Sequence, residues 1–396
     1  MNNLPATDES LPLAGVRVLE LARILAGPWA GQLLADLGAD VIKVERPEEG
    51  DDTRRWGPPF VRSAAGDDLG AAYFHSCNRG KRSVAIDIAT AEGQARVRAL
   101  AAEADVLIEN FKVGDLARHG LDSSAMRAIN PRLIYCSITG FGQTGPYAHR
   151  PGYDFIVQGM GGMMSITGEP DGPPQKGGVA YADILTGVYS VVGILAALRQ
   201  REHTGRGADV DMALLDTQVG VLGNQALNWM VSGEVPHRMG NGHPNLVPYQ
   251  SFACADGDVI IAAGNDRQFA RLCAVLDRDA LANDARFATN PDRVVNRQIL
   301  IPMIAEATAK WGSAALYAAL EANGIPAGPV NRIDQVFADP QVVARQMRRS
   351  VSDGSAELPG LAAPIVLDGN RMGSRKSAPR LGEDGDALWR PRSLSD

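Results

Sequence analysis

Short apolar runs alternate with amphipathic segments through the first half of the chain. The runs have the length of strands, and the segments between them space their apolar residues as one face of a helix does. The pattern predicts strands at 16–21, 41–45, 83–88, 106–110, 133–138 and 208–212, and helices at 27–38, 91–104 and 123–129. Strands that alternate with helices predict a parallel sheet covered on both faces, so we expect an α/β, Rossmann-like large domain.

The pattern changes near residue 214. One long helix is predicted from about Leu214 to Val231, within a linker over 214–235. A stretch rich in Gly, Pro and Asn follows, and then one strand and three helices are predicted, at 259–263, 269–276, 301–311 and 314–323. We expect residues 1–213 and 330–396 to form the large domain and residues 236–329 to form a smaller α/β domain. The tail after residue 331 is expected to be rich in loops.

The longest apolar run lies at 184–198 and contains no charged residue. Small and bulky residues alternate along it, which predicts a helix buried over most of its circumference. The run is shorter than the roughly 20 residues of a membrane span, so no membrane partner is expected. Asp183 precedes the run, where the helix dipole and free N–H groups would keep a carboxylate ionised. An ordinary helix cap and a catalytic nucleophile both fit this position.

Composition narrows the class of protein. A formal net charge of −7 without a basic stripe gives no footprint for nucleic acid, and the polar N-terminus is unlike a signal peptide. Four scattered cysteines predict free thiols in a reducing compartment, so a cytoplasmic protein is expected. The six histidines show no metal-binding spacing, so no metal is expected. The turn at 22–28 holds one glycine, which argues against a nicotinamide dinucleotide site.

A set of short motifs follows in order from about Leu13 to the last thirty residues. They are Val41–Pro47 with Gly50–Asp51, Asn110–Phe111, Arg118–Leu121, Asn130–Tyr135, Thr139–Gln143, Gly152–Asp154, Thr186–Gly187 and Thr204–Gly207. By this ordered set the chain resembles the class III CoA-transferases, the family of formyl-CoA transferase and L-carnitine CoA-transferase. The resemblance implies an interlocked homodimer that takes an acyl-CoA and a carboxylic acid as substrates and uses no metal.

The family nucleophile is an aspartate just before the apolar helix, and Asp183 matches it. The resemblance implies that Asp183 attacks an acyl-CoA thioester, forms a mixed anhydride, and then carries CoA as an aspartyl thioester. It also implies coenzyme A contacts at Ile24, Leu25, Arg46, Ile86, Asn110, Phe111, Lys112, Arg118, Arg150 and Tyr153. Two lysines of formyl-CoA transferase are absent, because Ala89 and Pro151 stand at their positions.

Two other functions stay open. The same fold hosts 2-methylacyl-CoA racemases, which have a histidine before the aspartate where this chain has Gly152-Tyr153-Asp154. A tyrosine, with a pKa of about 10, is a poor base toward carbon at neutral pH. A non-catalytic acyl-CoA-binding paralogue would share the CoA contacts, although the intact Asp183 argues against it.

Within the family, segments 50–60, 138–146 and 247–250 most resemble the succinyl-CoA:glutarate, or dicarboxylate, CoA-transferases. This resemblance implies succinyl-CoA as the donor and a dicarboxylate such as glutarate as the acceptor. A dicarboxylate needs a cation for its distal carboxylate. The candidates are Arg55, Arg150 and Arg238.

Overall fold

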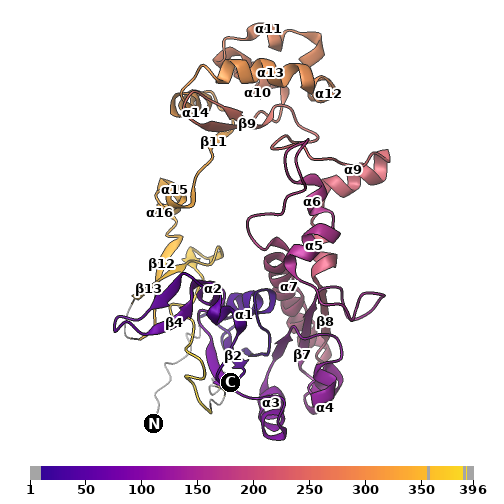
Figure 1. The fold of residues 1–396 in the computed structure, drawn as a ribbon, viewed down its shortest axis with the longest axis vertical. Helices are drawn as coiled ribbons and strands as arrows, with labels where there is room; N and C mark the ends of the chain where they lie inside the picture. Colours follow the sequence, from indigo (N-terminus) through magenta and orange to yellow (C-terminus); the bar gives the residue numbers. More distant parts are fainter. Residues whose placement is uncertain (1–9, 355–356, 387–388, 390–396) are drawn as a thin grey trace. The chain divides into compact units, whose positions relative to one another are not determined.

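The computed structural model describes residues 10–354, 357–386 and 389 of the chain (Figure 1). The chain divides into two compact units. The first comprises Met1–Met163, Gly177–Asn224 and Pro340–Asp396, and the second comprises Met164–Lys176 and Gln225–Asp339. The domain boundaries expected from the sequence stay a prediction. Each unit is described by itself below.

A six-stranded parallel sheet forms the centre of the first unit. Its strands lie in the order β5 (Arg82–Ala85), β2 (Asp40–Glu45), β1 (Arg17–Glu20), β6 (Val106–Glu109), β7 (Ile134–Thr139) and β8 (Asp209–Ala213). All five pairings are parallel, which confirms the predicted parallel sheet. The chain winds outward from β1 in one direction and then from β6 in the other. In such doubly wound sheets, ligands bind at the carboxyl ends of the strands where the direction switches.

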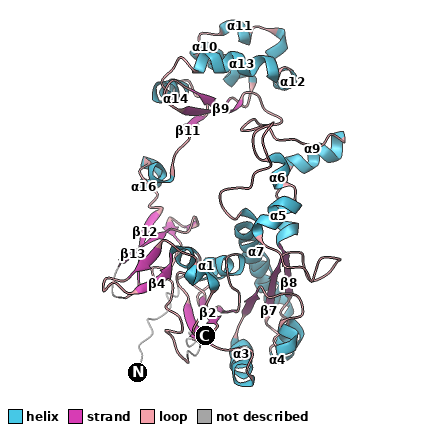
Figure 2. Ribbon diagram, viewed as in Figure 1, coloured by secondary structure: helices cyan, strands magenta, loops and turns pink. Residues whose placement is uncertain are grey.

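Both faces of this sheet are covered by helices, which explains why successive strand residues are apolar. Val18 faces a core formed with helices α1 (Ala26–Asp36) and α7 (Tyr181–Thr204). Leu19, the next residue, faces a second core formed with α3 (Ala91–Glu103) and α4 (Ser123–Ile129). Figure 2 shows these helices beside the sheet. The predicted helices at 91–104 and 123–129 therefore form and cover one face.

Helix α7 is longer than the apolar run that predicted it. It extends from Tyr181 to Thr204, so by length and composition it is long enough to cross a membrane. Its buried residues, however, pack in the core beside α1 and the sheet, as those of a core helix do. At Gly187 the two helices meet through their backbones. A Cβ atom there would lie 2.7 Å from the carbonyl oxygen of Ala26 and 3.0 Å from the Cβ of Trp29.

The single helix predicted over 214–231 is wrong. The chain forms α8 (Leu214–Gly220) and α9 (Asn224–Ser232), separated by residues 221–223. Gly223 adopts a left-handed conformation with a φ of 52°. Glycine takes this conformation without a steric cost, and it interrupts the right-handed helix.

Shorter elements complete the first unit. The tail that was expected to be loop-rich contains two antiparallel hairpins, β12–β13 and β14–β15. The remaining elements are η1 (Asp52–Arg55), β3 (Phe60–Arg62), β4 (Asp68–Ala71), α2 (Ala72–Ser76), η2 (Leu116–His119), α5 (Asp154–Met160), α6 (Met163–Ile166, which ends in the second unit), α16 (Pro340–Ala344), β12 (Arg348–Ser352), β13 (Glu357–Leu361), β14 (Val366–Leu367) and β15 (Asn370–Arg371).

The second unit has a small antiparallel sheet and its own apolar core. Phe252 and Ile261 from the sheet pack with Leu272, Ile304 and Leu316 from the helices. The strands lie in the order β11 (Ala327–Pro329), β10 (Asp258–Ala262) and β9 (Tyr249–Ala253), and the other elements are α10 (Asp266–Val275), α11 (Asp279–Ala282), η3 (Ala285–Phe287), α12 (Asn290–Val295), α13 (Arg297–Thr308), α14 (Ser313–Ala322) and α15 (Ile333–Val336).

The contact between α1 and α7 gives a first testable prediction. Gly187→Ala should lower the free energy of unfolding by about 1–3 kcal/mol, because the added methyl group meets backbone that cannot move aside. Gly220→Ala is the matched control, since no atom of the described residues lies within 4 Å of a Cβ atom at that position. Urea unfolding followed by circular dichroism measures both. Equal stability of the two variants would contradict the close contact.

Candidate active site

A cavity of about 460 Å³ opens at the carboxyl ends of β1, β2, β5 and β6. This is the switch point of the sheet, where doubly wound folds bind their ligands. Its lining combines apolar groups with polar and charged side chains of both signs, as ligand sites commonly do. Arg23, Arg46, Ile86, Phe111 and His119 are among the residues that line it.

The structure brings many of the predicted CoA contacts to this edge of the sheet. Arg46, Ile86 and Phe111 line the cavity itself. Ile24, Leu25 and Asn110 lie in the loops that follow β1 and β6. Two of the three predicted phosphate-binding cations are paired with acids. Arg46 pairs with Glu49, and Arg118 lies 2.6 Å from Asp115.

The other predicted contacts lie elsewhere in the first unit. Lys112 lines a neighbouring cavity of about 360 Å³. Arg150 and Tyr153 lie in the loop between β7 and α5, and the Arg150 guanidinium lies 3.9 Å from the ring centre of Tyr147. Neither Arg150 nor Tyr153 lines the cavity at the switch point. The predicted contacts thus divide into a cluster at the switch point, Lys112 in the neighbouring cavity, and Arg150 and Tyr153 just before α5.

Buried charges surround the base of this cavity, and sequence reasoning missed them. Lys43 Nζ lies 3.0 Å from both Glu20 Oε1 and Asp51 Oδ2, and Lys81 Nζ lies 2.8 Å from Glu20 Oε2. Burial by itself would lower the pKa of Lys43, but the charges of Glu20, Asp51 and Glu45 raise it above its usual value. The signal in the sequence was a charged residue inside a mostly apolar strand, as with Glu20 in 16–21 and Lys43 in 41–45.

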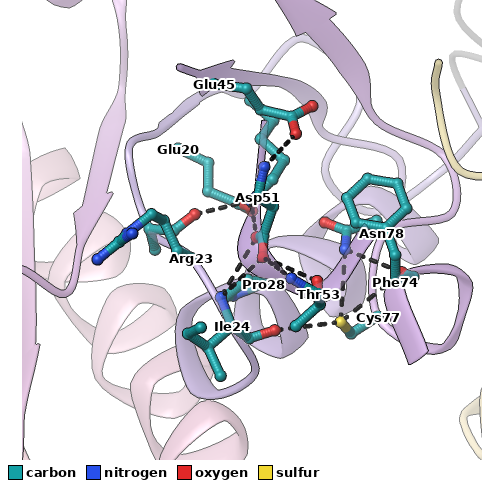
Figure 3. Close-up of polar contacts among 12 residues, drawn as sticks. Glu20, Arg23, Ile24, Pro28, Glu45, Asp51, Thr53, Phe74, Cys77 and Asn78 are labelled. Carbon is teal, nitrogen blue, oxygen red and sulfur yellow. Dashed lines mark hydrogen bonds and ion pairs between the residues drawn. The ribbon is translucent and has the colours of Figure 1, made fainter. Parts of the chain in front are cut away.

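Asp51 also holds the loop after β1 in an unusual conformation (Figure 3). Ile24 has a φ of 72°, which is sterically costly for a β-branched residue. Its N–H donates to the Asp51 carboxylate at 3.2 and 3.3 Å, and its carbonyl oxygen accepts from Cys77 Sγ at 3.6 Å. Backbone strain of this kind is found at ligand sites, where the surrounding structure maintains it.

Asn110 fixes the same loop from the other side. Its amide nitrogen donates to the carbonyl oxygen of Arg23 at 2.7 Å, and its amide oxygen accepts from the N–H of Arg23 at 2.9 Å. The side chain therefore bridges the loops that follow β1 and β6. Asn110 was predicted to contact CoA, and in this structure its amide holds the turn that carries Ile24.

The carboxyl group of Asp183 lies in the first turn of α7, near α5. The N-cap residue of α7 is Ala180, which has no capping side chain. The cap comes instead from α5, because Asp154 Oδ1 accepts from the N–H of Ala182 at 2.8 Å and from that of Asp183 at 3.4 Å. Asp183 is therefore not the helix cap. Within residues 10–354, 357–386 and 389, its carboxylate accepts no hydrogen bond.

This environment corrects the expectation that Asp183 stays ionised. Burial raises the pKa of Asp183 to about 7, and the negative charge of Asp154 adds to the effect. The helix terminus does not offset these two causes, since Asp154 already takes the N–H groups. Asp183 is thus a part-buried carboxyl group that changes charge near neutral pH, as functional acids commonly do.

Tyr73 is a second residue that sequence reasoning missed. It lies on α2, and its ring packs edge-on against Trp56 with ring centres 5.3 Å apart. Burial raises the pKa of Tyr73 to about 12, with contributions from the charges of Asp183, Cys77, Asp154 and Asp51. Its phenol is therefore near both Asp183 and the network below the cavity, and it stays a hydrogen-bond donor at neutral pH.

The start of α5 is set by two glycines in close backbone contact. A Cβ atom on Gly152 would lie 2.4 Å from the Cα of Gly140, and one on Gly140 would lie 2.5 Å from the Cα of Gly152. Any side chain at either position would separate the two segments. This contact places Tyr153 and Asp154 directly beside the end of β7.

The cavity at the switch point of the doubly wound sheet has apolar, basic and acidic residues in its lining. The carboxyl group of Asp183 accepts no hydrogen bond from the described part of the chain. This combination fits an enzyme that acts on a nucleotide-bearing substrate through a carboxylate. Residues 13–385 match the model of CoA-transferase family III, and the chain belongs to this family. The resemblance inferred from the motifs is therefore confirmed. The chain is a class III CoA-transferase, and acyl-CoA is its substrate.

Relatives of known name agree with this assignment. The chain is 56% identical over 374 residues to the succinate–glutarate CoA-transferase of Agrobacterium fabrum, covering 94% of this chain and 93% of that protein. It is 41% identical to the human succinyl-CoA:glutarate CoA-transferase, covering 97% and 85%. A CAIB/BAIF family protein from Brucella suis has a similar crystal structure, with a TM-score of 0.84, 56% identity, and coverage of 95% and 97%.

The conformation of Ile24 gives a second prediction. Ile24→Gly should remove a backbone cost of roughly 1–2 kcal/mol and so leave the unfolding free energy unchanged or raised. If Ile24 contacts CoA as the family resemblance implies, the variant should also weaken CoA binding by about tenfold, because that apolar contact and the fixed loop would be lost. Isothermal titration with CoA and urea unfolding measure the two effects.

Asp277→Gly is the control for this prediction. Asp277 also has a positive φ, of 54°, and lies in the second unit. This variant should relieve its local backbone conformation and leave CoA affinity unchanged. Unchanged CoA affinity in Ile24→Gly would contradict a role of Ile24 at the site.

Proposed function

We propose that this protein transfers CoA from succinyl-CoA to a dicarboxylate such as glutarate, with Asp183 as the nucleophile. The observation that carries the proposal is the part-buried carboxyl group of Asp183, which accepts no hydrogen bond from residues 10–354, 357–386 and 389. The substrate class is supported by the names of the relatives at 56% and 41% identity.

The reaction proceeds by four exchanges at carbonyl carbon. A carboxylate oxygen of Asp183 attacks the thioester of succinyl-CoA, the C–S bond breaks, and CoA leaves as thiolate from a succinyl–aspartyl anhydride. The thiolate attacks the aspartyl carbonyl, which releases succinate and leaves an aspartyl-CoA thioester. Glutarate then attacks this thioester to give a glutaryl–aspartyl anhydride and thiolate. The thiolate attacks the glutaryl carbonyl, which gives glutaryl-CoA and regenerates Asp183.

The raised pKa of Asp183 suits these steps. A carboxylate of higher pKa is a more basic nucleophile, while a pKa of about 7 still leaves about half of it ionised at neutral pH. Because the ionised form reacts, the rate should rise with pH through about 7 and level off above it. The phenol of Tyr73, which stays protonated at neutral pH, would donate a hydrogen bond to oxygen at the reacting carbon.

Coenzyme A would bind along the carboxyl edge of the sheet. Ile86 and Phe111 offer apolar contact to the adenine, and Arg46, Lys112 and Arg118 offer charge to the phosphates. Arg46 and Arg118 would exchange their present acidic partners for phosphate. Arg150 and Tyr153 would contact the substrate near Asp183, and Arg55, Arg150 and Arg238 remain the candidates for a distal carboxylate.

The first unit would be the Rossmann-like CoA-binding domain, and the protein would be a cytoplasmic, interlocked homodimer. Helix α9 supports the dimer, since it contains no buried residue and exposes 66% of Met230 and 83% of Val231. An apolar helix of this kind is expected to be covered by another surface. A second copy of the chain is the occupant that the family resemblance implies.

The dimer proposal predicts a change of mass in solution. The double variant Met230→Glu/Val231→Glu should lower the molar mass found by light scattering from twice the chain mass toward the chain mass. Ile129→Glu is the control, because Ile129 is also exposed but ends α4 on the first unit. If the double variant remains a dimer, α9 does not form part of the dimer interface.

Covalent capture tests the nucleophile directly. Wild-type protein incubated with succinyl-CoA and quenched rapidly should carry a CoA or succinyl adduct on the peptide that contains Asp183, and glutaryl-CoA should form when glutarate is added. Asp183→Ala should show neither the adduct nor the product, with CoA affinity within about threefold of wild type. Asp216→Asn, which changes an exposed acid on α8, is the control and should retain both.

Two results would contradict this proposal. Exchange that persists in Asp183→Ala would remove Asp183 as the nucleophile. Deuterium entering the α-carbon of a 2-methylacyl-CoA, without adduct or exchange, would favour the racemase alternative. Transfer of CoA to monocarboxylates but not to diacids of four to six carbons would overturn the substrate class alone.

A further inference from the structure

The side chain of Gln158 ties α5 to the loop that precedes Asp183. It is fully buried, and both ends of its amide have partners. Its nitrogen donates to Asp154 Oδ2 at 2.7 Å, and its oxygen accepts from the N–H of Gly177 at 2.9 Å. One side chain thus connects the carboxylate that caps α7 to the backbone that leads into α7.

The loop at Gly177 passes close to the first turn of α7. A Cβ atom there would lie 2.3 Å from the ring of Tyr181. A side chain at this point would therefore force the Tyr181 ring or the loop to move. The hydrogen bond from the N–H of Gly177 to Gln158 fixes this loop, and the hydrogen bond from the N–H of Ala182 to Asp154 fixes the start of α7.

The carboxylate of Asp154 is fully engaged by these groups. Oδ1 accepts from the N–H of Ala182 and of Asp183, and Oδ2 accepts from Gln158. An oxygen that caps a helix could equally come from Ser, Thr or Asn. Aspartate differs from these in bringing a negative charge to within the first turn of α7, beside the reacting carboxyl group.

Among the charged and titratable groups around α7, Asp154 is the one whose charge acts on Asp183. Asp154 is the residue whose charge raises the pKa of Asp183, after burial. Tyr73 on α2 is neutral at physiological pH, since its pKa is about 12. The elements packed on α7 carry the other such groups, which are Asp36 at the far end of α1, Tyr135 and Cys136 on β7, Asp209 and Asp211 on β8, and Asp216 on α8.

We propose that Asp154 and Gln158 are positioning residues, which hold the Asp183 carboxyl group in place and set the pH range over which it reacts. This inference rests on the proposed function of Asp183. Neither residue needs to touch the substrate. Gln158 orients Asp154, and Asp154 acts on Asp183 through the helix end and through its charge.

Two variants separate the charge from the hydrogen bonds. Asp154→Asn removes the charge, but the amide nitrogen that it introduces then faces the amide nitrogen of Gln158, so one hydrogen bond becomes a contact between two donors. Adding Gln158→Glu restores the two shorter hydrogen bonds, because the new carboxylate accepts from the amide introduced at position 154 and from the N–H of Gly177, and only the 3.5 Å hydrogen bond to the carbonyl oxygen of Val179 is lost. It also returns one negative charge to the site. Asp216→Asn serves again as the matched loss of a carboxylate.

The measurement is kcat/KM for succinyl-CoA at saturating glutarate between pH 5.5 and 9, which reports groups of the free enzyme, in which Asp183 carries no acyl group or CoA. Asp154→Asn should move the acidic limb down by about one pH unit and lower kcat about tenfold or more. The double variant should recover most of kcat and return the acidic limb toward that of wild type. Asp216→Asn should match wild type in both.

A purely structural role would lower kcat in Asp154→Asn and leave the acidic limb where it is, and that result would overturn the proposal. A double variant no closer to wild type than the single one would also overturn it. Should Asp154→Asn fail to fold by circular dichroism, recovery of fold and activity in the double variant supports the proposal, and continued failure overturns it. Adduct mapping on wild-type protein is independent of these results, so the nucleophile and its positioning fail separately.

Discussion

The carboxylate of Glu20, at the end of the central strand β1, is the constraint on which the substrate edge depends. It pairs with two buried lysines, Lys43 from β2 and Lys81, and α1 packs directly over it. A Cβ atom on Gly31 of α1 would lie 1.8 Å from Glu20 Oε2. Removing one partner from a buried network of this kind costs several kcal/mol, since the remaining charge stays buried without compensation. The base of the cavity is therefore stabilised by a network of buried ion pairs, in which each charge compensates another.

The pKa values of two other buried carboxyl groups, those of Glu45 and Asp183, are shifted in opposite directions. Burial alone would raise the pKa of Glu45, but Arg54, Lys43 and Ser83 bring it below its usual value. Arg54 reaches both oxygens of Glu45, at 2.8 and 2.6 Å. Asp183 has burial without any such partner among the described residues, and its pKa rises. Partners thus keep the carboxyl group of Glu45 ionised within the site, whereas the Asp183 carboxyl group keeps a raised pKa.

The spacing of apolar residues predicted those strands and helices that bury one regular face. The strands of the sheet and helices α3 and α4 follow from apolar spacing, because each buries a regular stripe. The break between α8 and α9 comes from the left-handed backbone at Gly223, and the start of α7 depends on its contact with Asp154. Apolar spacing encodes neither. Asp183 could be found from its place before an apolar run together with the family resemblance. Its cap from Asp154, and the conformation of Ile24, could not.

The turn after β1 explains how a doubly wound sheet can lack a dinucleotide-binding motif and still bind a nucleotide-bearing substrate. In dinucleotide folds, backbone N–H groups at this turn hold the pyrophosphate. Here the Asp51 carboxylate accepts the N–H of Ile24, so the turn already holds an anion supplied by the protein. A second anion at that position would meet charge repulsion. Phosphates of CoA would therefore have to be bound by side chains further along the edge, which fits the cations Arg46, Lys112 and Arg118.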